Sequence, residues 1–77
     1  MIGIVNKSVY KDDYKLVVER LKRARLDAGL SQQTVADKLG RPQSYISKIE
    51  SGERRVDIIE VKALAKLYNQ KIEELVS

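Results

Sequence analysis

The sequence contains no cysteine and no histidine among its 77 residues. Without cysteine, a disulfide scaffold and a thiolate metal site are both excluded, and a cytoplasmic location fits. Histidine is the commonest general acid or base near neutral pH, so its absence removes the usual starting point for catalysis. No Gly-rich phosphate loop or paired-carboxylate motif takes its place. We therefore expect a protein that is not an enzyme and that uses no metal, no cofactor and no small-molecule substrate.

Tryptophan and phenylalanine are also absent, and there are only four Gly and one Pro. Leu, Ile, Val and Ala must therefore form the core, and the scarcity of turn residues favours helices over a β fold. No apolar run approaches the roughly 20 residues that span a membrane, so we expect no membrane contact. One hydrophobic core needs most of a chain this short. We expect a single all-α domain at 13–77, preceded by an N-terminal arm or tail at 1–12.

The net charge of +4 is unevenly distributed along the chain. Residues 1–30 carry seven Lys or Arg against four Asp or Glu, and residues 31–55 carry five against three. Residues 56–77 carry three against four. The excess of basic residues in 1–55 suits a polyanionic partner. The near-neutral residues 56–77 leave a surface for another contact.

Apolar spacing and capping residues predict five short helices. We expect the first at about 13–28, where apolar residues recur at helical spacing and Asp12 or Asp13 can cap the N-terminus. Ser8 is a second candidate cap, which would start the helix one turn earlier. Gly29 is expected to end the helix, because glycine readily takes the positive φ found at helix C-termini.

The next two helices are bracketed by residues that start and stop helices. Ser31 is expected to cap a helix at 32–39, and Gly40 to end it. Pro42 suits the first turn of the following helix, because an N–H there has no helical partner in any case. Gly52 is expected to end this third helix.

The C-terminal part of the sequence predicts two further helices. Asp57 is a good N-cap, with Glu60 three residues later as its capping-box partner. The fourth helix is expected to end at Asn69 and to face inward with Ile58, Val61, Leu64, Ala65 and Tyr68. A short fifth helix at 71–76 carries Ile72, Leu75 and Val76.

Residues 32–51 form the pattern of a helix-turn-helix. This motif requires apolar residues where two helices meet, a small residue where they cross and a glycine at the turn. The sequence supplies these in register, with Val35, Leu39, Ile46 and Ile49 as apolar contacts, Ala36 as the small residue and Gly40 at the turn. Each residue alone is common, but all of them together are a fairly specific signal.

The stretch LSQQTVADKLGRPQSYISKIESG resembles the helix-turn-helix of the Cro/phage-repressor-like (XRE-type) family of bacterial and phage transcription regulators. With the flanking helices, the resemblance covers roughly residues 13–76. It implies a lambda-repressor-like domain of five helices that binds a double-stranded DNA operator as a homodimer, with its third helix in the major groove. Arg41 departs from the apolar or small residue that is common at this position. Arg41-Pro42 also replaces a Ser, Thr or Asp cap, which leaves the start of the third helix open by one residue.

The polar face of the third helix is the candidate reading surface. Ser44, Ser47 and Lys48 lie roughly opposite the two inward isoleucines, and Gln43 lies in the first turn. A helix tip that enters the major groove presents such residues to base edges. Gln can pair with adenine N6 and N7, Ser with several base edges, and Lys with guanine O6 and N7. The alternative is that they are ordinary exposed polar residues.

Basic residues flank the reading helix at its two ends, namely Arg41, Arg54 and Arg55. They suit contacts with DNA phosphates, which fix the register of a protein on the duplex, or else they are solvated loop charges. Tyr45 lies beside the reading face, where it either contacts a phosphate or a thymine methyl group or packs against the second helix. The family resemblance implies that Gln32 touches a phosphate and braces Gln43.

Arg25 and Glu50 both lie on helix faces that the apolar period assigns to the interior. The family resemblance implies a buried ion pair between them, which would join the first helix to the third. We therefore interpret both residues as parts of the scaffold rather than as DNA contacts.

Apolar residues in the C-terminal helices exceed what one small core needs. Four of them form the candidate dimer interface, namely Ile59, Ile72, Leu75 and Val76. A two-fold dimer requires a self-complementary apolar patch, and a single helix-turn-helix makes only a small contact with DNA. The alternative is that the fifth helix only closes the core.

The sequence thus predicts a sequence-specific DNA-binding transcription regulator, a homodimeric repressor whose two reading helices contact half-sites one helical turn apart. The alternative from another class is a protein-interaction module, such as an antitoxin or accessory regulator, that binds a partner protein through its C-terminal helices. The excess of basic residues in 1–55 favours DNA binding, although an antitoxin can do both.

Overall fold

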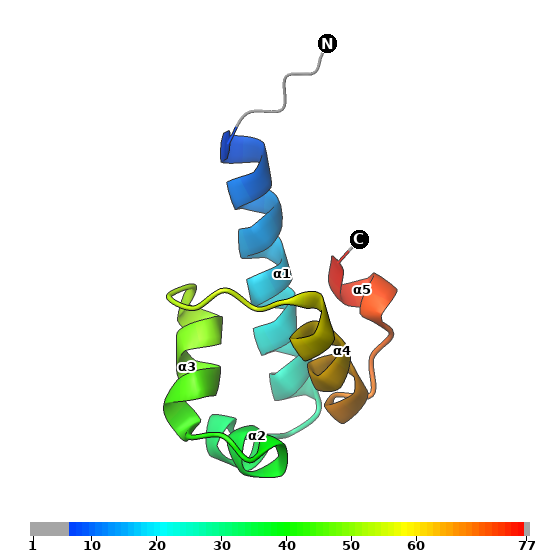
Figure 1. Cartoon of the computed structure of the whole chain (residues 1–77). Coiled ribbons are helices and arrows are strands. Elements are labelled where there is room, and N and C mark those ends of the chain that lie inside the picture. Colours follow the sequence, from blue (N-terminus) through cyan, green and yellow to red (C-terminus); the bar gives the residue numbers. More distant parts are fainter. Residues whose placement is uncertain (1–6, 77) are drawn as a thin grey trace.

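Five α-helices make up the part of the chain that the structure, a computed structural model, describes, namely residues 7–76. They are α1 (Lys7–Asp27), α2 (Gln32–Leu39), α3 (Gln43–Ser51), α4 (Ile58–Leu67) and α5 (Ile72–Val76). Residues 7–76 contain no strand. The all-α fold of five helices that the sequence predicted is therefore confirmed (Figure 1).

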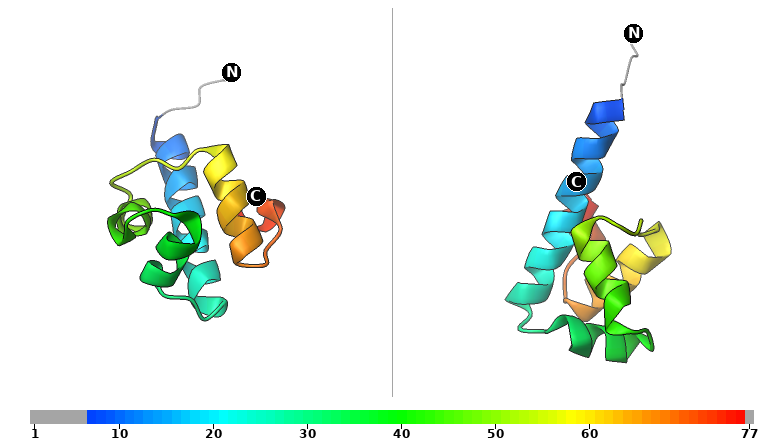
Figure 2. Two further views of the ribbon diagram at one scale, coloured as in Figure 1. Left: turned by 60° about the horizontal axis from the view of Figure 1, so that its bottom comes forward. Right: turned by 90° about the vertical axis from the view of Figure 1, so that its left-hand side faces the viewer.

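The long helix α1 is the axis around which the other helices pack (Figure 1). It contacts α3 on one side and α4 and α5 on the other, while α2 packs against α3. Figure 2 shows from two further sides that the N-terminal turns of α1 extend beyond the other four helices. The core therefore surrounds the C-terminal half of α1, and α3 lies at the edge of the fold.

Helix α1 begins earlier than the sequence predicted. It starts at Lys7, six residues before the expected start at about residue 13. No Gly or Pro interrupts it, and a helix continues at little cost through charged and aromatic residues when nothing breaks it. The helix therefore contains the three candidate caps Ser8, Asp12 and Asp13. Residues 7–12 belong to α1 rather than to an N-terminal arm or tail, and residues 1–6 of that expected arm lie outside the described residues.

Helix α2 has the boundaries and caps that the sequence predicted. The Thr34 N–H donates to Ser31 Oγ at 3.0 Å, which satisfies one free donor of the first turn. Gly40 ends the helix with a φ of 68°, and the N–H of Arg41 donates to the Ala36 carbonyl at 2.9 Å. Glycine takes this left-handed conformation without the steric penalty of a Cβ atom. Gly40 therefore sets the turn from α2 to α3.

Helix α3 begins at Gln43, one residue later than the sequence predicted. Pro42 is the N-cap, with an extended ψ of 155° and no side-chain cap bond. Its carbonyl accepts from the Tyr45 N–H at 3.0 Å, which closes the first turn. This geometry removes the one-residue ambiguity at Arg41-Pro42 and makes Gln43 the first residue of the helix.

The core is a hydrophobic, mainly aliphatic cluster between α1, α2, α3 and α4, closed by α5. Its largest fully buried side chains are Leu21, Val35, Ile46, Ile49 and Leu64. The inward position predicted for Ile58 is wrong, since its side chain is 56% exposed. Ile58 is the first residue of α4, and helical side chains point back toward the N-terminus, here beyond the packed part of the helix.

A buried ion pair joins α1 to α3. Arg25 Nε donates to Glu50 Oε2 at 2.7 Å, and Arg25 Nη2 donates to Glu50 Oε1 at 3.1 Å. The side chains of Arg25 and Glu50 are 8% and 5% exposed. Arg25 Nη1 also donates to the Leu30 carbonyl at 2.8 Å, in the turn after α1. The bond to Glu50 raises the pKa of Arg25 above its ordinary value, although burial acts in the opposite direction.

Glu60 bonds the start of α4 to α3 and to the loop before α4. The Glu60 N–H donates to Asp57 Oδ1 at 2.8 Å, and the Asp57 N–H donates to Glu60 Oε1 at 2.9 Å, which is the predicted capping box. The same carboxylate accepts from the Tyr45 hydroxyl at 2.6 Å and from Arg54 Nη1 at 3.2 Å. Partial burial alone would raise the pKa of Glu60, but these donors outweigh it and lower that pKa.

Tyr14 fixes the loop between α3 and α4 to α1. Its hydroxyl donates to the Arg54 carbonyl at 3.1 Å and accepts from the Val56 N–H at 3.1 Å. The Arg55 guanidinium lies 4.5 Å from the centroid of the Tyr14 ring. These contacts hold the loop against a helix that is distant in sequence.

We predict that Glu50→Ala destabilises the fold by about 3–5 kcal/mol, because Arg25 would remain as a buried charge without its partner. Urea unfolding followed by circular dichroism gives the free energies of unfolding of variant and wild type. Asp27→Ala is the matched control, since it removes the acid of an α1 ion pair whose side chains are 77% and 57% exposed. Exposed pairs contribute little to stability. Equal losses in the two variants would contradict a scaffold role for the buried pair.

We also predict that Glu60 stabilises the fold less in acid. Its pKa in the folded state lies below the ordinary value of 4.5, so its contribution is fully present above about pH 5 and is lost as the pH falls through the lowered value. The difference in free energy of unfolding between wild type and Glu60→Gln should therefore be constant near neutral pH and shrink in acid. Urea unfolding at a series of pH values measures this difference. A difference that stays constant down to about pH 3 would contradict selective bonding of the Glu60 carboxylate.

Candidate nucleic-acid interface

Helix α3 has one side packed and one side uncovered. Ile46 and Ile49 are fully buried where α3 contacts α1 and α2. The right-hand view of Figure 2 shows that no other helix covers the outer side of α3. On α3, Ser44 and Lys48 are exposed and Ser47 is half-buried. The structure thus leaves two of these three candidate base contacts exposed and the third half-buried.

Gln43 is the exposed first residue of α3, and it is bonded to the first residue of α2. Gln43 Nε2 donates to Gln32 Oε1 at 2.6 Å. The family resemblance implied that these two glutamines act as a pair, and the structure brings them together. The bond fixes the Gln43 side chain at the tip of the uncovered helix.

Gln32 has a second partner that the sequence did not lead us to expect. Its Nε2 donates to Glu50 Oε1 at 2.9 Å, so the exposed pair of glutamines is connected to the buried ion pair. Glu50 follows Gln43 by seven residues, which places both on the same side of a helix. That spacing is the signal from which the contact could have been inferred.

The three arginines that flank α3 each lie against a tyrosine ring. The guanidinium groups of Arg41 and Arg54 lie 5.1 and 4.7 Å from the centroid of the Tyr45 ring, and Arg55 lies over the tyrosine of α1. Such cation–π contacts orient a guanidinium group. Arg41 and Arg55 are exposed, whereas Arg54 is half-buried and forms an ion pair with Glu60 that raises the pKa of Arg54. The charge of Arg54 is therefore partly balanced within the protein.

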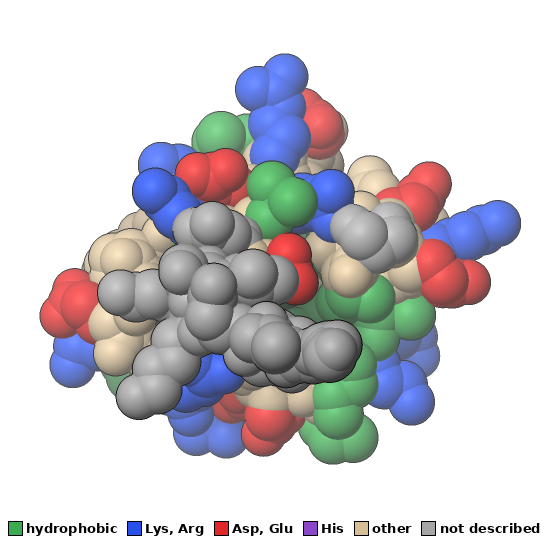
Figure 3. All heavy atoms as spheres, turned by 90° about the horizontal axis from the view of Figure 1, so that it is seen from above, with side chains coloured by type: hydrophobic (Ala, Val, Ile, Leu, Met, Phe, Trp, Pro, Cys, Tyr) green, Lys and Arg blue, Asp and Glu red, His purple; other side chains and the backbone are tan. Residues whose placement is uncertain are grey.

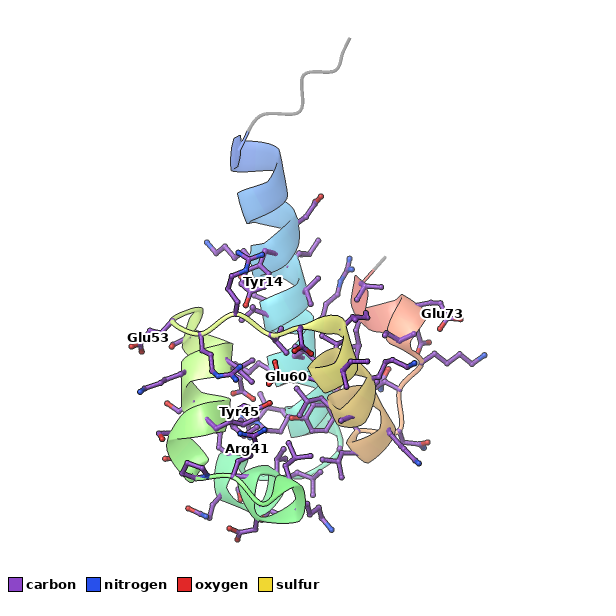
Figure 4. All side chains as sticks on the ribbon, viewed as in Figure 1. Tyr14, Arg41, Tyr45, Glu53, Glu60 and Glu73 are labelled. Carbon is purple, nitrogen blue, oxygen red and sulfur yellow. The ribbon has the colours of Figure 1, made fainter. Side chains whose placement is uncertain are left out.

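The structure corrects the expected phosphate contact of Tyr45. The side chain is 9% exposed and lies between α3 and α4, beside Arg41 and Glu60 (Figure 4). Its hydroxyl is already bonded to Glu60, and burial together with this bond raises the pKa of Tyr45 to about 12. The ring belongs to the hydrophobic core cluster, together with the next residue, Ile46. Tyr45 is thus a packing residue and a support for two arginines.

The candidate dimer surface is partly different from the one expected. Leu75 is 2% exposed and belongs to the hydrophobic core, so it is corrected from an interface residue to a core residue. Ile59 is 68% exposed, Val76 is exposed and Ile72 is half-buried. The exposed Leu16 of α1, which the sequence pattern did not single out, lines a shallow hollow together with Val76. Figure 3 shows hydrophobic side chains gathered on the α4 and α5 side of the molecule.

Among the residues that the structure describes, there is neither a metal-binding cluster nor a membrane-spanning helix. Among the described residues, no group of three or more carboxylates lies close enough together to hold a metal ion. No helix in this part of the chain is both long enough and apolar enough to cross a membrane.

Comparison with known proteins identifies the family. Residues 21–75 match the family model described as Helix-turn-helix. An XRE-family like protein from Pseudomonas syringae pv. tomato str. DC3000 is 36% identical with a TM-score of 0.84, and the match covers 90% of this chain and 84% of that one. The restriction-modification controller protein C.AhdI from Aeromonas hydrophila is 35% identical with a TM-score of 0.72, over 86% of this chain and 98% of that one. The search of curated proteins found no match.

These matches agree with the geometry. The family match includes the whole helix-turn-helix of α2 and α3, and both structural matches extend over most of each chain. The same unit carries the uncovered polar side of α3 and the glycine turn that orients it. The chain therefore belongs to the XRE-type helix-turn-helix family of DNA-binding transcription regulators.

Proposed function

We propose that this chain is a homodimeric repressor that reads a double-stranded DNA operator with α3 in the major groove. The observation that carries the proposal is the position of Gln43. It is the first residue of a helix whose outer side is uncovered, and its amide is held by Gln32 at 2.6 Å. A side chain fixed at the tip of such a helix is suited to base recognition, because little conformational entropy is lost on binding.

The polar side of α3 supplies the base contacts. Gln43 pairs with adenine through N6 and N7, and Lys48, five residues further along the helix, suits guanine O6 and N7. Ser44 and Ser47 contact neighbouring base edges. No hydrogen bond or ion pair joins the side chains of Ser44 and Lys48 to another described residue, so both keep their full bonding capacity for DNA.

The phosphate contacts surround this reading surface. Arg41 precedes α3 and Arg55 follows it, and both charges are exposed. Arg54 keeps N–H groups that Glu60 does not use and makes a weaker contact. Gln32 retains one N–H after its bond to Glu50, and the N-terminal N–H groups of α2 attract the same phosphate. Such contacts fix the register of the protein on the duplex without reading its sequence.

The dimer interface uses the exposed apolar residues of α4, α5 and α1. Ile59 and Val76 are its exposed residues and Ile72 is half-buried, while Leu16 lines a hollow together with Val76. Two copies related by a two-fold axis would read half-sites about 34–36 Å apart. The second recognition helix increases the affinity beyond that of one small module.

A protein-interaction module is the alternative, and the two adjacent isoleucines Ile58 and Ile59 favour it, since they are 56% and 68% exposed. In that case α4 and α5 would bind a partner protein, such as a toxin, instead of a second copy. Salt-dependent binding to an unrelated duplex separates the two functions, because a pure interaction module would show none.

We predict that duplexes selected from a random pool contain two-fold symmetric half-sites, and that Gln43→Ala weakens binding to them by about 1–3 kcal/mol. The variant should also lose the base preference at one position in each half-site. Fluorescence anisotropy with the selected duplex and its single-base variants measures both effects. Gln33→Ala is the control, because the Gln33 amide bonds to Asp37 at 2.8 Å rather than to α3. Unchanged affinities of Gln43→Ala for selected and random duplexes would contradict the role of α3.

We further predict that Arg41→Ala weakens binding to selected and random duplexes by the same factor and lowers the salt slope by about 1, because one phosphate contact is lost. Titrations at several salt concentrations give the slope. Arg23→Ala serves as control, since Arg23 is an exposed α1 residue paired with Asp27 at 3.3 Å. A slope that Arg41→Ala leaves unchanged would remove Arg41 from the phosphate contacts.

A further inference from the structure

A continuous chain of hydrogen bonds runs from the core to the tip of α3. The Arg25 guanidinium donates to both oxygens of Glu50, at 2.7 and 3.1 Å. Glu50 Oε1 then accepts from Gln32 Nε2 at 2.9 Å, and Gln32 Oε1 accepts from Gln43 Nε2 at 2.6 Å. The chain begins at side chains that are 8% and 5% exposed and ends at an exposed glutamine.

Glu50 determines the direction of every bond in this chain. An ionised carboxylate only accepts hydrogen bonds, whereas the amide of a glutamine donates at one end and accepts at the other. Gln32 must therefore turn its nitrogen toward Glu50 and its oxygen toward Gln43. The reversed amide would place its oxygen against the Glu50 carboxylate, and Glu50 Oε1 would keep only one of its two donors, Arg25 Nη2. Gln43 in turn must donate to Gln32.

This direction decides what Gln43 can offer to DNA. One N–H of its amide is used by Gln32, so one N–H and the oxygen remain. The major-groove edge of adenine presents one acceptor, N7, and one donor, the N6 amino group, which match this pair. Guanine presents two acceptors, N7 and O6, and would need two donors. Because one N–H of Gln43 is already bonded to Gln32, only one donor remains for the base, which disfavours guanine.

We propose that Glu50 is a specificity-determining residue that positions Gln43 for adenine and against guanine without touching DNA. The inference rests on the proposed function, in which Gln43 reads a base. Glu50 acts on Gln43 only through Gln32. Besides forming the ion pair with Arg25, its carboxylate fixes which way the hydrogen bonds from Gln32 and Gln43 point.

Glu50→Gln tests whether Glu50 sets the direction of these hydrogen bonds, because this substitution changes the shape of the side chain least. When the oxygen of the introduced amide keeps the shorter bond to Arg25 Nε, the new amide nitrogen lies beside Gln32 and also beside the Arg25 Nη2 donor, whose bond to Glu50 is lost. This nitrogen donates, so Gln32 can turn around and Gln43 can present its amide reversed. We expect the ratio of affinities for adenine over guanine at the base pair read by Gln43 to fall roughly tenfold or more. A purely structural role of Glu50 would weaken binding to both duplexes equally and leave the ratio unchanged.

Gln32→Leu is the second variant, because it breaks the chain and leaves the ion pair between Arg25 and Glu50 intact. If circular dichroism shows that Glu50→Gln does not fold, Gln32→Leu tests whether the chain of hydrogen bonds determines the base preference. Gln33→Leu is its matched control, with the same substitution one residue away at a side chain that bonds to Asp37 of its own helix. A lower ratio in Gln32→Leu and a wild-type ratio in Gln33→Leu support the proposal.

The outcomes separate this inference from the proposed function. If the wild type discriminates adenine from guanine and folded Gln32→Leu keeps the wild-type ratio, the role of Glu50 is overturned while DNA reading by α3 stands. If the wild type binds all duplexes equally, the proposed function fails, and the inference fails with it.

Discussion

The bidentate ion pair between Arg25 and Glu50 is the interaction on which the rest of the structure depends. It joins α1 to α3, holds the turn after α1 through the Leu30 carbonyl and bonds the start of α2 through Gln32. Apolar packing is non-directional, so the aliphatic core alone does not determine how the helix-turn-helix is oriented on α1. A buried pair is tolerated only when its hydrogen-bonding groups are satisfied, and here further donors and acceptors complete it.

Polar contacts hold both ends of α3, and two buried isoleucines pack its middle against the core. At the N-terminal end, Gln43 is bonded to α2. In the first turn, the Tyr45 hydroxyl also donates to the carboxylate of Glu60. After the C-terminal end, Arg54 donates to the same carboxylate, and Tyr14 holds the loop. The helix is therefore presented as a rigid element with one free side. Rigidity of this kind suits a reading helix, because the geometry of base contacts tolerates little displacement.

Local rules in the sequence were sufficient for most of the fold. The caps at Ser31 and at Asp57 with Glu60 involve residues three apart, so the sequence contains all the information that they need. Contacts between distant helices were harder to infer. Tyr45 meets Glu60 from another helix, and the hydroxyl of Tyr14 bonds residues of a distant loop, neither of which leaves a periodic signal. Burial of Leu75 likewise depends on where α5 docks, which apolar spacing does not specify.

The central claim is that α3 reads DNA while the chain of hydrogen bonds behind it stays intact. A crystal structure of the protein bound to its selected duplex tests this most directly. We predict that Gln43 Oε1 and Nε2 lie about 2.7–3.2 Å from adenine N6 and N7, with Gln43 still bonded to Gln32. A complex in which α3 faces solvent and another surface contacts the duplex would contradict it.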